Sequence, residues 1–300
     1  MIDLHIHTNY SDGSKSVEEI LVMAQNMGLN TISFTDHDCC CAYFDLEKPD
    51  IAKLFSGKIK KGIEITTSFE GARIELLAYD FDNYELIDKY FKEANDNIDW
   101  QEIMVKERLI LLNKFKNFGI KYPKEFENNM LLDRFEAKIY DEILKINDKT
   151  QLKELLGEFY CETGKEFFRK CIVNPNSPFY ANYGKYRPKI EEILKLIHDN
   201  NGLVFLAHPF GYRLQDAKSF IEKLYNTYDL DGIECYYNGF TKEEIDYLVS
   251  FANDRKILIS GGSDYHGTID RDNELGKCMF GQSFIADEII NNWPLKYKQR

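Results

Sequence analysis

The chain has 300 residues, of which 44% are hydrophobic, so it can fill the core of one large domain or two small ones and is not a disordered chain. Its 38 Lys and Arg residues against 50 Asp and Glu residues give a formal charge of -12, which argues against a general nucleic-acid coat and against a membrane-surface binder. The apolar runs are far shorter than the roughly 20 residues of a membrane helix, and the amino-terminal segment has neither the basic flank nor the apolar core of a signal peptide.

The elements expected in the first eighty residues alternate as βα units do. Short apolar runs predict strands at residues 2–7, 31–35, 59–66 and 73–79, and an amphipathic pattern predicts a helix over 17–27 that ends at Gly28. From about residue 83, apolar side chains recur every three, four or seven positions, which indicates one long helix or a pair of helices. Helical signals persist to about residue 171, and a Pro and Asn stretch at 174–178 then breaks them.

The βα rhythm returns around residue 190. The pattern predicts helices over 189–198, 215–225 and 242–253, and strands over 203–207, 232–235 and 257–260. We therefore expect a mostly helical segment inserted into an α/β domain.

The seven cysteines are an odd number without CxxC spacing, so we expect a reducing, cytoplasmic setting and no disulfide framework. Three of them, Cys39, Cys40 and Cys41, are consecutive. They could be catalytic nucleophiles, but free cysteine is commonly core material, and packing is the favoured interpretation.

Five of the six histidines lie at or just beyond the carboxyl ends of the predicted strands. His5 and His7 are two apart on the first strand, so they project from the same face and can bind a single cation. Alone, such a pair is weak evidence for a metal site, because it also occurs as ordinary strand residues. Asp12 follows in a Ser-Asp-Gly turn.

Similar residues follow the later strands. His37 stands in a Thr-Asp-His-Asp sequence that by itself also fits a helix N-cap. Glu64 has apolar neighbours, where an unpaired carboxylate is costly to bury and a metal ion removes that cost. The candidates at later strand ends are His208, Asp264 and His266. Because the carboxyl ends of such strands meet at one rim, the whole set predicts a site for hard or borderline cations.

Five motifs in this order, HIHTNYSDG, FTDHD, GIEI, LAHP and GGSDYHG, resemble the signatures of the PHP (polymerase and histidinol phosphatase) superfamily of metal-dependent phosphoesterases. The resemblance covers residues 1–80 and about 185–270. It implies an α/β fold, a distorted (β/α)7 TIM-like barrel over residues 1–82 and 185–300, with a mostly helical insertion, or cap, over 83–184. It also implies two or three divalent ions, Mn, Fe or Zn, at the carboxyl rim.

The resemblance also implies which residues hold the ions. One ion matches the ligands His5, His7, Glu64 and Asp264; another matches Asp12, His37, His208 and His266, with Glu64 bridging toward a third. Where relatives have a histidine ligand for the third ion, this chain has Glu75. Glu75 is either a carboxylate ligand, which suits Mn, or only the partner of Arg73 on the same strand face.

Clustered cations lower the pKa of a bound water toward roughly 7, so a metal-bound hydroxide is the expected nucleophile and no protein nucleophile is needed. A phosphate substrate also needs cationic recognition, best supplied by a guanidinium. Arg134 lies roughly where relatives carry a phosphate-binding arginine, and Arg213 follows a ligand strand, although either could be a solvated surface residue. Glu234 ends a strand and is expected to support the ligands, whereas His198 lies outside every motif, near a helix end.

The acidic balance favours a small phosphorylated metabolite or nucleotide as the substrate and disfavours a long nucleic acid, whose binding depends on Lys and Arg. Histidinol phosphate and nucleoside bisphosphates are the substrates that the resemblance suggests. The alternatives are an exonuclease that trims short nucleic acid, an amidohydrolase that cleaves C–N bonds, and a catalytically degenerate barrel that only binds metal. The SDG, TDHD and SDYH sequences argue against the amidohydrolase.

Overall fold

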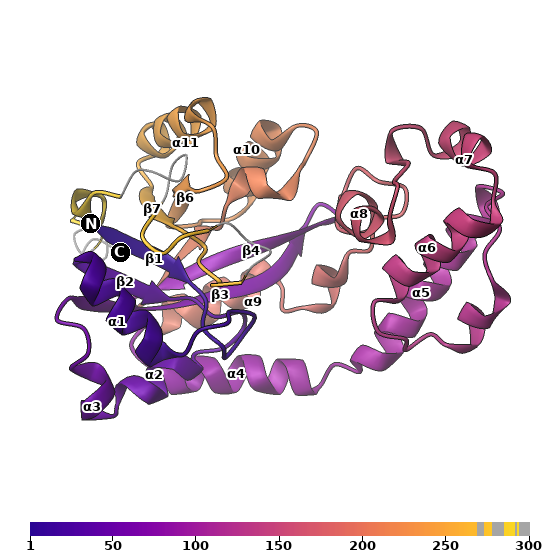
Figure 1. Cartoon of the computed structure of the whole chain (residues 1–300). Coiled ribbons are helices and arrows are strands. Elements are labelled where there is room, and N and C mark those ends of the chain that lie inside the picture. The colour runs from indigo at the N-terminus through magenta and orange to yellow at the C-terminus, as the bar shows by residue number, and fades with distance from the viewer. Residues whose placement is uncertain (269–272, 278–284, 292, 294–300) are drawn as a thin grey trace. The chain divides into compact units, whose positions relative to one another are not determined.

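The computed structural model describes residues 1–268, 273–277, 285–291 and 293 (Figure 1). The chain divides into two compact units. The first comprises residues 1–95, 184–211 and 217–300, and the second comprises residues 96–183 and 212–216. We expected the insertion to begin at residue 83, but nearly all of the helix that starts there belongs to the first unit, and a five-residue loop after 211 belongs to the second.

The first unit contains a seven-stranded sheet whose strands follow the chain order: β1 (Ile2–Ile6), β2 (Thr31–Phe34), β3 (Lys58–Phe69), β4 (Ala72–Tyr79), β5 (Leu203–Leu206), β6 (Gly232–Tyr237) and β7 (Leu258–Gly262). The sheet curls until its edges meet, because the segment after β7 pairs with the end of β1. The backbone N–H of His7 donates to the carbonyl of Tyr265 at 2.9 Å, and Ile6 and Tyr265 form a parallel bridge. The expected α/β barrel is therefore confirmed.

One strand departs from the expected series of βα units. β4 runs antiparallel to both β3 and β5, whereas the other neighbouring pairs are parallel. Glu70 and Gly71 join β3 to β4 in a two-residue turn, with φ angles of 49° and 81°. A turn this short closes a hairpin and leaves no room for the helix that a parallel crossover requires.

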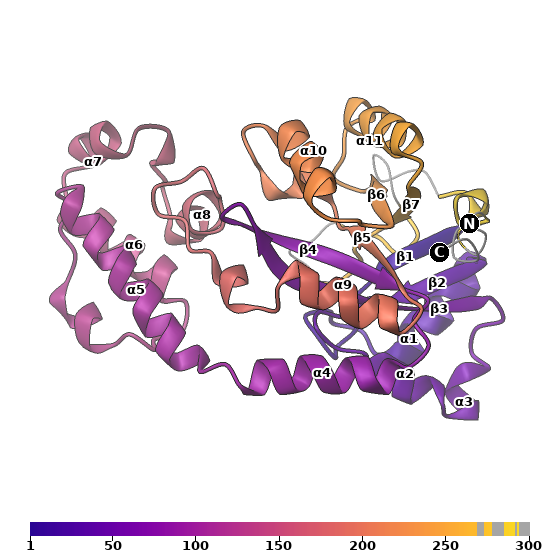
Figure 2. The ribbon, with the colours of Figure 1, turned by 180° about the vertical axis from the view of Figure 1, so that it is seen from behind.

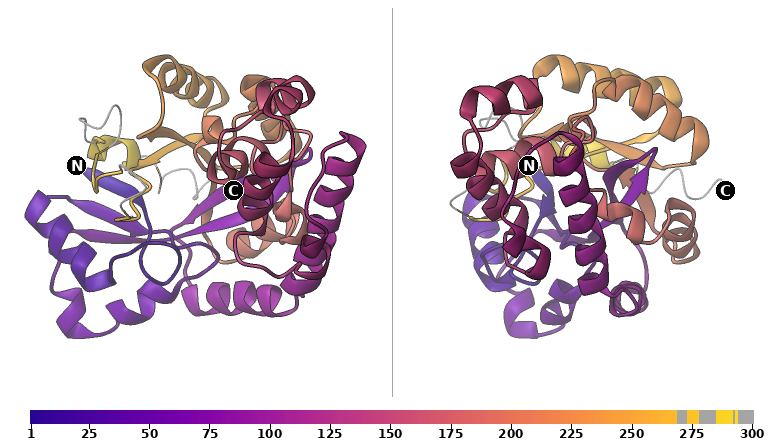
Figure 3. Two further views of the ribbon diagram at one scale, coloured as in Figure 1. Left: turned by 45° about the vertical axis from the view of Figure 1, so that its right-hand side comes forward. Right: turned by 90° about the vertical axis from the view of Figure 1, so that its right-hand side faces the viewer.

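In the described residues of the first unit, the α-helices that surround or extend from this sheet are α1 (Val17–Met27), α2 (Cys41–Leu46), α3 (Pro49–Ala52), α4 (Tyr84–Asp96), α9 (Ile190–Asp199), α10 (Ala217–Thr227) and α11 (Lys242–Arg255). α1 begins in a capping box between Ser16 and Glu19 and ends at Gly28, whose φ of 71° suits glycine. α9 packs against β5 (Figure 2), and α11 packs against β6 and β7, with α10 beside it in every view (Figure 3). The helices thus cover the outside and leave the strand ends to carry the polar motifs.

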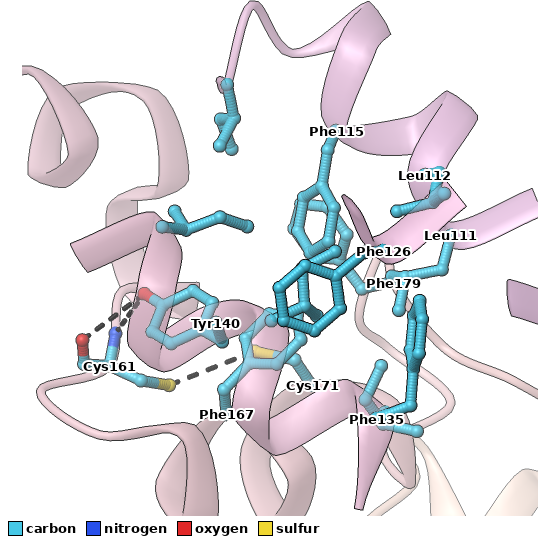
Figure 4. Packing of buried hydrophobic residues seen from close by; sticks show 14 of the residues in the cluster. Leu111, Leu112, Phe115, Phe126, Phe135, Tyr140, Cys161, Phe167, Cys171 and Phe179 are labelled. Carbon is cyan, nitrogen blue, oxygen red and sulfur yellow. Dashed lines mark hydrogen bonds between the residues drawn. The ribbon is translucent and has the colours of Figure 1, made fainter. Parts of the chain in front are cut away.

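The second unit is a helical bundle with its own apolar core (Figure 4). Its α-helices are α5 (Trp100–Asn117), α6 (Phe135–Ile146), α7 (Lys149–Leu156) and α8 (Gly164–Phe167). The rings of Tyr140 and Phe167 stack with centroids 4.2 Å apart, and the hydroxyl of Tyr140 donates to the carbonyl of Cys161 at 3.2 Å. The periodic pattern that starts at residue 83 proves to be a pair of helices, since Asp99 caps the start of α5.

Within the part of the chain that the structure describes, no helix combines the length and the apolar character needed to cross a membrane.

Candidate metal centre

The end of β1 presents two imidazoles on one face, as the spacing of His5 and His7 predicts. Both side chains are fully buried. The Nε2 of His5 lies 3.3 Å from an oxygen of Glu64 and 3.4 Å from an oxygen of Asp264, and the Nε2 of His7 lies 3.2 Å from each of the same two oxygens. These four side chains, from β1 and the residue after it, from β3 and from the segment after β7, form the first group of donors that could hold a metal ion.

A second group shares His7 with the first and adds Asp12, His37 and His266. Asp12 Oδ1 lies 2.9 Å from the Nε2 of His266, 3.6 Å from the Nε2 of His37 and 3.6 Å from the Nδ1 of His7. The rings of His7 and His266 stack with centroids 4.1 Å apart. The turn after β1, the loop after β2 and the loop after β7 therefore meet at one place.

A third group contains His37, Glu64 and Glu75. We expected His208 to join Asp12, but its Nε2 lies 2.9 Å from Glu64 Oε1 and 3.4 Å from Glu75 Oε2. The antiparallel pairing of β4 with β5 explains this placement, because the backbone N–H of residue 207 donates to the carbonyl of Glu75 at 3.0 Å. The hairpin direction of β4 thus brings Glu75 beside the histidine that follows β5.

Glu234 contacts two of the candidate ligands. It lies inside β6, which continues past the strand end expected at residue 235, and it is fully buried. Its Oε1 lies 3.0 Å from the Nδ1 of His5, and its Oε2 accepts the backbone N–H of His208 at 2.7 Å. A carboxylate at Nδ1 favours the tautomer that leaves Nε2 free to bind a metal. These contacts are compatible with a supporting role, which stays a prediction for Glu234.

Two other buried carboxylates at the site have roles that sequence reasoning missed. Asp36 accepts the backbone N–H and hydroxyl of Thr8 and the hydroxyl of Ser11, so it holds the turn that carries Asp12. Asp3 accepts the backbone N–H and hydroxyl of Ser263. It thereby ties β1 to the segment that carries Asp264. Two features of the sequence could have pointed to these roles. Asp3 alternates with His5 and His7 along the first strand, and Asp36 directly precedes His37.

The site has strong internal electrostatics. Burial opposes ionisation of Glu64, but the surrounding imidazoles, His5 foremost, hold its pKa well below the usual range. Burial also opposes a charged ring at His7, but the carboxylates of Asp264 and Glu64 raise its pKa to about 9. The same competition between burial and the Glu64 carboxylate raises the pKa of His208 to about 9. The carboxylates at this rim therefore require nearby positive charge.

The buried donors fit divalent cations. His5 Nε2, His7 Nε2 and His37 Nδ1 are buried without a hydrogen-bond partner, although each faces carboxylate oxygens. Buried polar atoms are normally paired, so an unpaired set of imidazole nitrogens among carboxylates is the arrangement that a metal ion completes. Imidazole and carboxylate donors together suit Mn, Fe and Zn.

The two arginines named from the sequence both lie in the second unit. Arg134 is highly exposed and near Asp133, and the guanidinium of Arg213 donates to the carbonyl of Arg169 at 2.9 Å. In the first unit, Arg73 pairs with Glu75 and Arg187 lies 3.2 Å from Asp38, the residue after His37.

His198 is separate from the candidate ligands. Its Nε2 lies 2.7 Å from Asp231 Oδ2, which also accepts the backbone N–H of Val204. Through Asp231 it joins α9 to β5, and it is not among the donors at the rim.

Comparisons with known proteins agree with this geometry. The family model of the PHP domain matches residues 3–233. The chain is 27% identical over 306 residues to a 5'-3' exoribonuclease of Haemophilus influenzae, with 97% of each protein covered. It is 22% identical to the phosphoribosyl 1,2-cyclic phosphate 1,2-diphosphodiesterase of Eggerthella lenta, with 90% of this chain and 95% of that protein covered. A solved structure from Bifidobacterium adolescentis is described as a candidate metal-dependent phosphoesterase. It superposes with a TM-score of 0.62 at 22% sequence identity, and the match covers 97% of this chain and 94% of that chain. This likeness shows a shared fold.

Proposed function

The chain belongs to the PHP domain family, and from this premise we propose that its rim of imidazoles and carboxylates holds divalent metal ions that serve phosphoester hydrolysis. The observation that carries the proposal is the set of three buried ring nitrogens, on His5, His7 and His37, that lack hydrogen-bond partners and face carboxylates. Three overlapping groups of donors support up to three ions. The proposed ligands are His5, His7, Asp12, His37, Glu64, Glu75, His208, Asp264 and His266.

Divalent ions at such a rim neutralise phosphoryl oxygens and activate water, as clustered metals do in phosphatases and nucleases. The chain's own part is to hold the donors in place. Glu234 fixes the ring of His5 and the backbone of His208, and Asp36 fixes the turn of Asp12. Burial raises the pKa of the Cys39 and Cys41 thiols, which supports a mechanism without a cysteine nucleophile.

For the substrate, we propose the 5′ end of a short RNA chain, from which single nucleotides are released. The support is the full-length similarity to a protein named as a 5'-3' exoribonuclease. The net charge of -12 restricts this proposal to the end of a short chain, because a long polyanion gains its affinity from many Lys and Arg contacts.

A second candidate is hydrolysis of a small phosphorylated metabolite or nucleotide. The acidic composition favours it, and so does the similarity to an enzyme named for a small cyclic phosphate. Either substrate requires cationic recognition of a phosphate. Arg134 and Arg213 remain proposals for this role, and Arg73 and Arg187 join them because they pair with carboxylates at or next to the metal ligands.

The six cysteines in the described part of the chain are free thiols. Free thiols are typical of a reducing compartment, and they support the proposal that the protein works in the cytoplasm.

One experiment separates the substrates. Purified protein with added Mn²⁺ is given a 5′-phosphorylated short RNA, a nucleoside bisphosphate and a chromogenic phosphomonoester, in parallel with the His5→Ala and Asp264→Ala variants. We expect stepwise release of nucleotides from the 5′ end, abolished in both variants while circular dichroism shows retained folding. Turnover of the monoesters alone supports the second candidate. No hydrolysis of any phosphoester by metal-loaded wild-type protein would overturn the proposed function.

A further inference from the structure

A second cluster of metal-binding atoms lies outside the rim, within the first unit. It consists of Cys39 and Cys41 from the loop after β2 and the first position of α2, and of Asp88 from α4. The donor atoms of these three side chains all lie within 4.8 Å of one another. All three residues are partly exposed, so a cation from solvent can reach them. None of them belongs to the three groups of donors at the rim.

The backbone of the loop arranges the three cysteines for different tasks. Cys40 is buried and its sulfur is not among the donors of the cluster, but its N–H donates to Asp88 Oδ1 at 2.8 Å and so orients that carboxylate. The N–H of Cys41 donates to the Cys39 sulfur at 3.1 Å, and the Cys41 sulfur lies 3.7 Å from Asp88 Oδ1. Cys40 is therefore a buried packing residue, whereas the sulfurs of Cys39 and Cys41 lie near the carboxylate of Asp88.

The donors of this cluster favour a different class of ion than the donors at the rim do. Two thiolates and one carboxylate suit soft or borderline cations such as Zn²⁺ and Cd²⁺, whereas imidazoles with several carboxylates also suit Mn. With metal–sulfur bonds of about 2.3 Å and metal–oxygen bonds of about 2.0–2.2 Å, the donors of a tetrahedral site lie roughly 3.5–3.8 Å apart. The Cys41 sulfur and Asp88 Oδ1, 3.7 Å apart, already have such a separation. Three protein donors leave a fourth position for water.

We propose that Cys39, Cys41 and Asp88 form a separate site for one Zn²⁺ or Cd²⁺ ion. On binding, the two sulfur–metal bonds replace two S–H bonds, and two protons pass to the solvent, so no oxidant or reductant takes part. Because Cys39 lies two residues after His37, the bound ion ties the loop that carries this rim histidine to α4. The site stands independently of the phosphoesterase proposal, since its occupation does not require turnover.

The test is a Cd²⁺ titration of the full-length protein, with the rim first loaded with Mn²⁺. We expect one Cd²⁺ per chain with a sulfur-to-cadmium charge-transfer band, release of two protons, and protection of Cys39 and Cys41 from alkylation as mapped by mass spectrometry. The double variant Cys39→Ser with Cys41→Ser loses the band. Asp88→Asn keeps the band but binds Cd²⁺ at least about tenfold more weakly.

Two controls separate this site from the rest of the molecule. Cys161 and Cys171, whose sulfurs lie 4.0 Å apart in the second unit, form another close pair of thiols, and substituting both by serine leaves the band intact. The His5→Ala variant also keeps the band although it lacks activity, so the two proposals fail separately. A band that survives loss of Cys39 and Cys41, or an unchanged affinity in Asp88→Asn, overturns the site. If the double variant does not fold, the affinity of Asp88→Asn for Cd²⁺ and the alkylation map of the wild type test the site in its place.

Discussion

The Oε1 of Glu234 lies 3.0 Å from the Nδ1 of His5, on the side of the ring opposite the atom that faces Glu64 and Asp264. The other oxygen of the same carboxylate accepts the backbone N–H of His208 at 2.7 Å. One fully buried side chain on β6 therefore orients a ring on β1 and fixes the backbone at the end of β5. Such outer partners set the tautomer and the direction of a ligating imidazole.

Glu234→Gln keeps the size of this side chain but removes its charge. We expect the affinity for Mn²⁺ to fall about 10-fold to 100-fold, because the Nδ1–H of His5 loses its anionic acceptor. Competition with a chromogenic chelator measures the affinity. Glu222→Gln is the matched control, since Glu222 is half-exposed and pairs with Arg255 away from the rim. Equal affinities in the two variants would contradict the role of Glu234.

Glu75 is engaged on both of its oxygens. Its Oε1 pairs with Arg73, and its Oε2 lies 3.4 Å from the Nε2 of His208. The two alternatives for this residue, ion pair and metal ligand, are thus compatible in one geometry. We expect Glu75→Gln to bind one metal ion fewer per chain than the wild type, because the third group of donors loses its second carboxylate.

Arg73→Gln is the control for that prediction. It breaks the same ion pair but leaves the carboxylate in place, so we expect it to keep the full complement of ions. Elemental analysis of gel-filtered protein counts the ions. If Glu75→Gln and the wild type hold the same number, Glu75 serves only as the partner of Arg73.

The sequence predicts the barrel and its rim because the strands and the candidate ligands are recognisable from short segments of the chain. Most of the motifs lie close to an apolar strand in the sequence: His5 and Glu64 stand within β1 and β3, and His37 and His266 follow β2 and β7 by a few residues. The carboxyl ends of parallel strands meet at one rim. The barrel, the family resemblance and the assignment as a hydrolase are confirmed. The substrate and the metal stay predictions, because neither is encoded in the spacing of the ligands.

The grouping of the ligands required the structure. His208 lies beside Glu75 because β4 runs antiparallel to β5, a consequence of the two-residue turn at Glu70 and Gly71. Strand spacing alone does not reveal this direction. The compact units divide the chain differently from the expected insertion over 83–184 for a similar reason. α4 continues the helical pattern of the insertion, but it buries Ile87 and Phe91 and groups with the barrel unit. Periodicity marks an apolar face but does not say which core receives it.

Gly262 lies where the barrel closes against His5, one of the proposed metal ligands. A Cβ at this position would lie 2.3 Å from both the backbone nitrogen and the Cβ of His5. Gly262→Ala therefore forces β7 away from β1, and we expect the free energy of unfolding to fall by about 1–3 kcal/mol and metal affinity to fall with it. Urea denaturation and chelator competition measure the two effects.

Gly28→Ala is the control for Gly262→Ala, because it strains the backbone without creating a steric clash. Gly28 has a φ of 71°, and a Cβ added there would meet no atom within 4 Å, so alanine costs about 1–2 kcal/mol of strain without touching the rim. We expect reduced stability with unchanged metal affinity. An unchanged metal affinity in Gly262→Ala as well would show that the close approach of β7 does not position His5.

The thiols in the core of the second unit predict a dependence of stability on pH. Burial raises the pKa of Cys171 from its ordinary value of 9.0 to about 12, and burial also raises that of Cys161. Between pH 9 and 12 the unfolded chain loses these protons while the folded chain keeps them, so the free energy of unfolding falls as pH rises, by at most about 1.4 kcal/mol per pH unit for each thiol. Urea denaturation at pH 8, 9.5 and 10.5, compared with the variant carrying Cys161→Ala and Cys171→Ala, isolates this contribution from other groups. The difference in stability between wild type and variant should be constant below pH 9 and shrink above it; a difference that stays constant throughout would mean that these thiols ionise equally in both states.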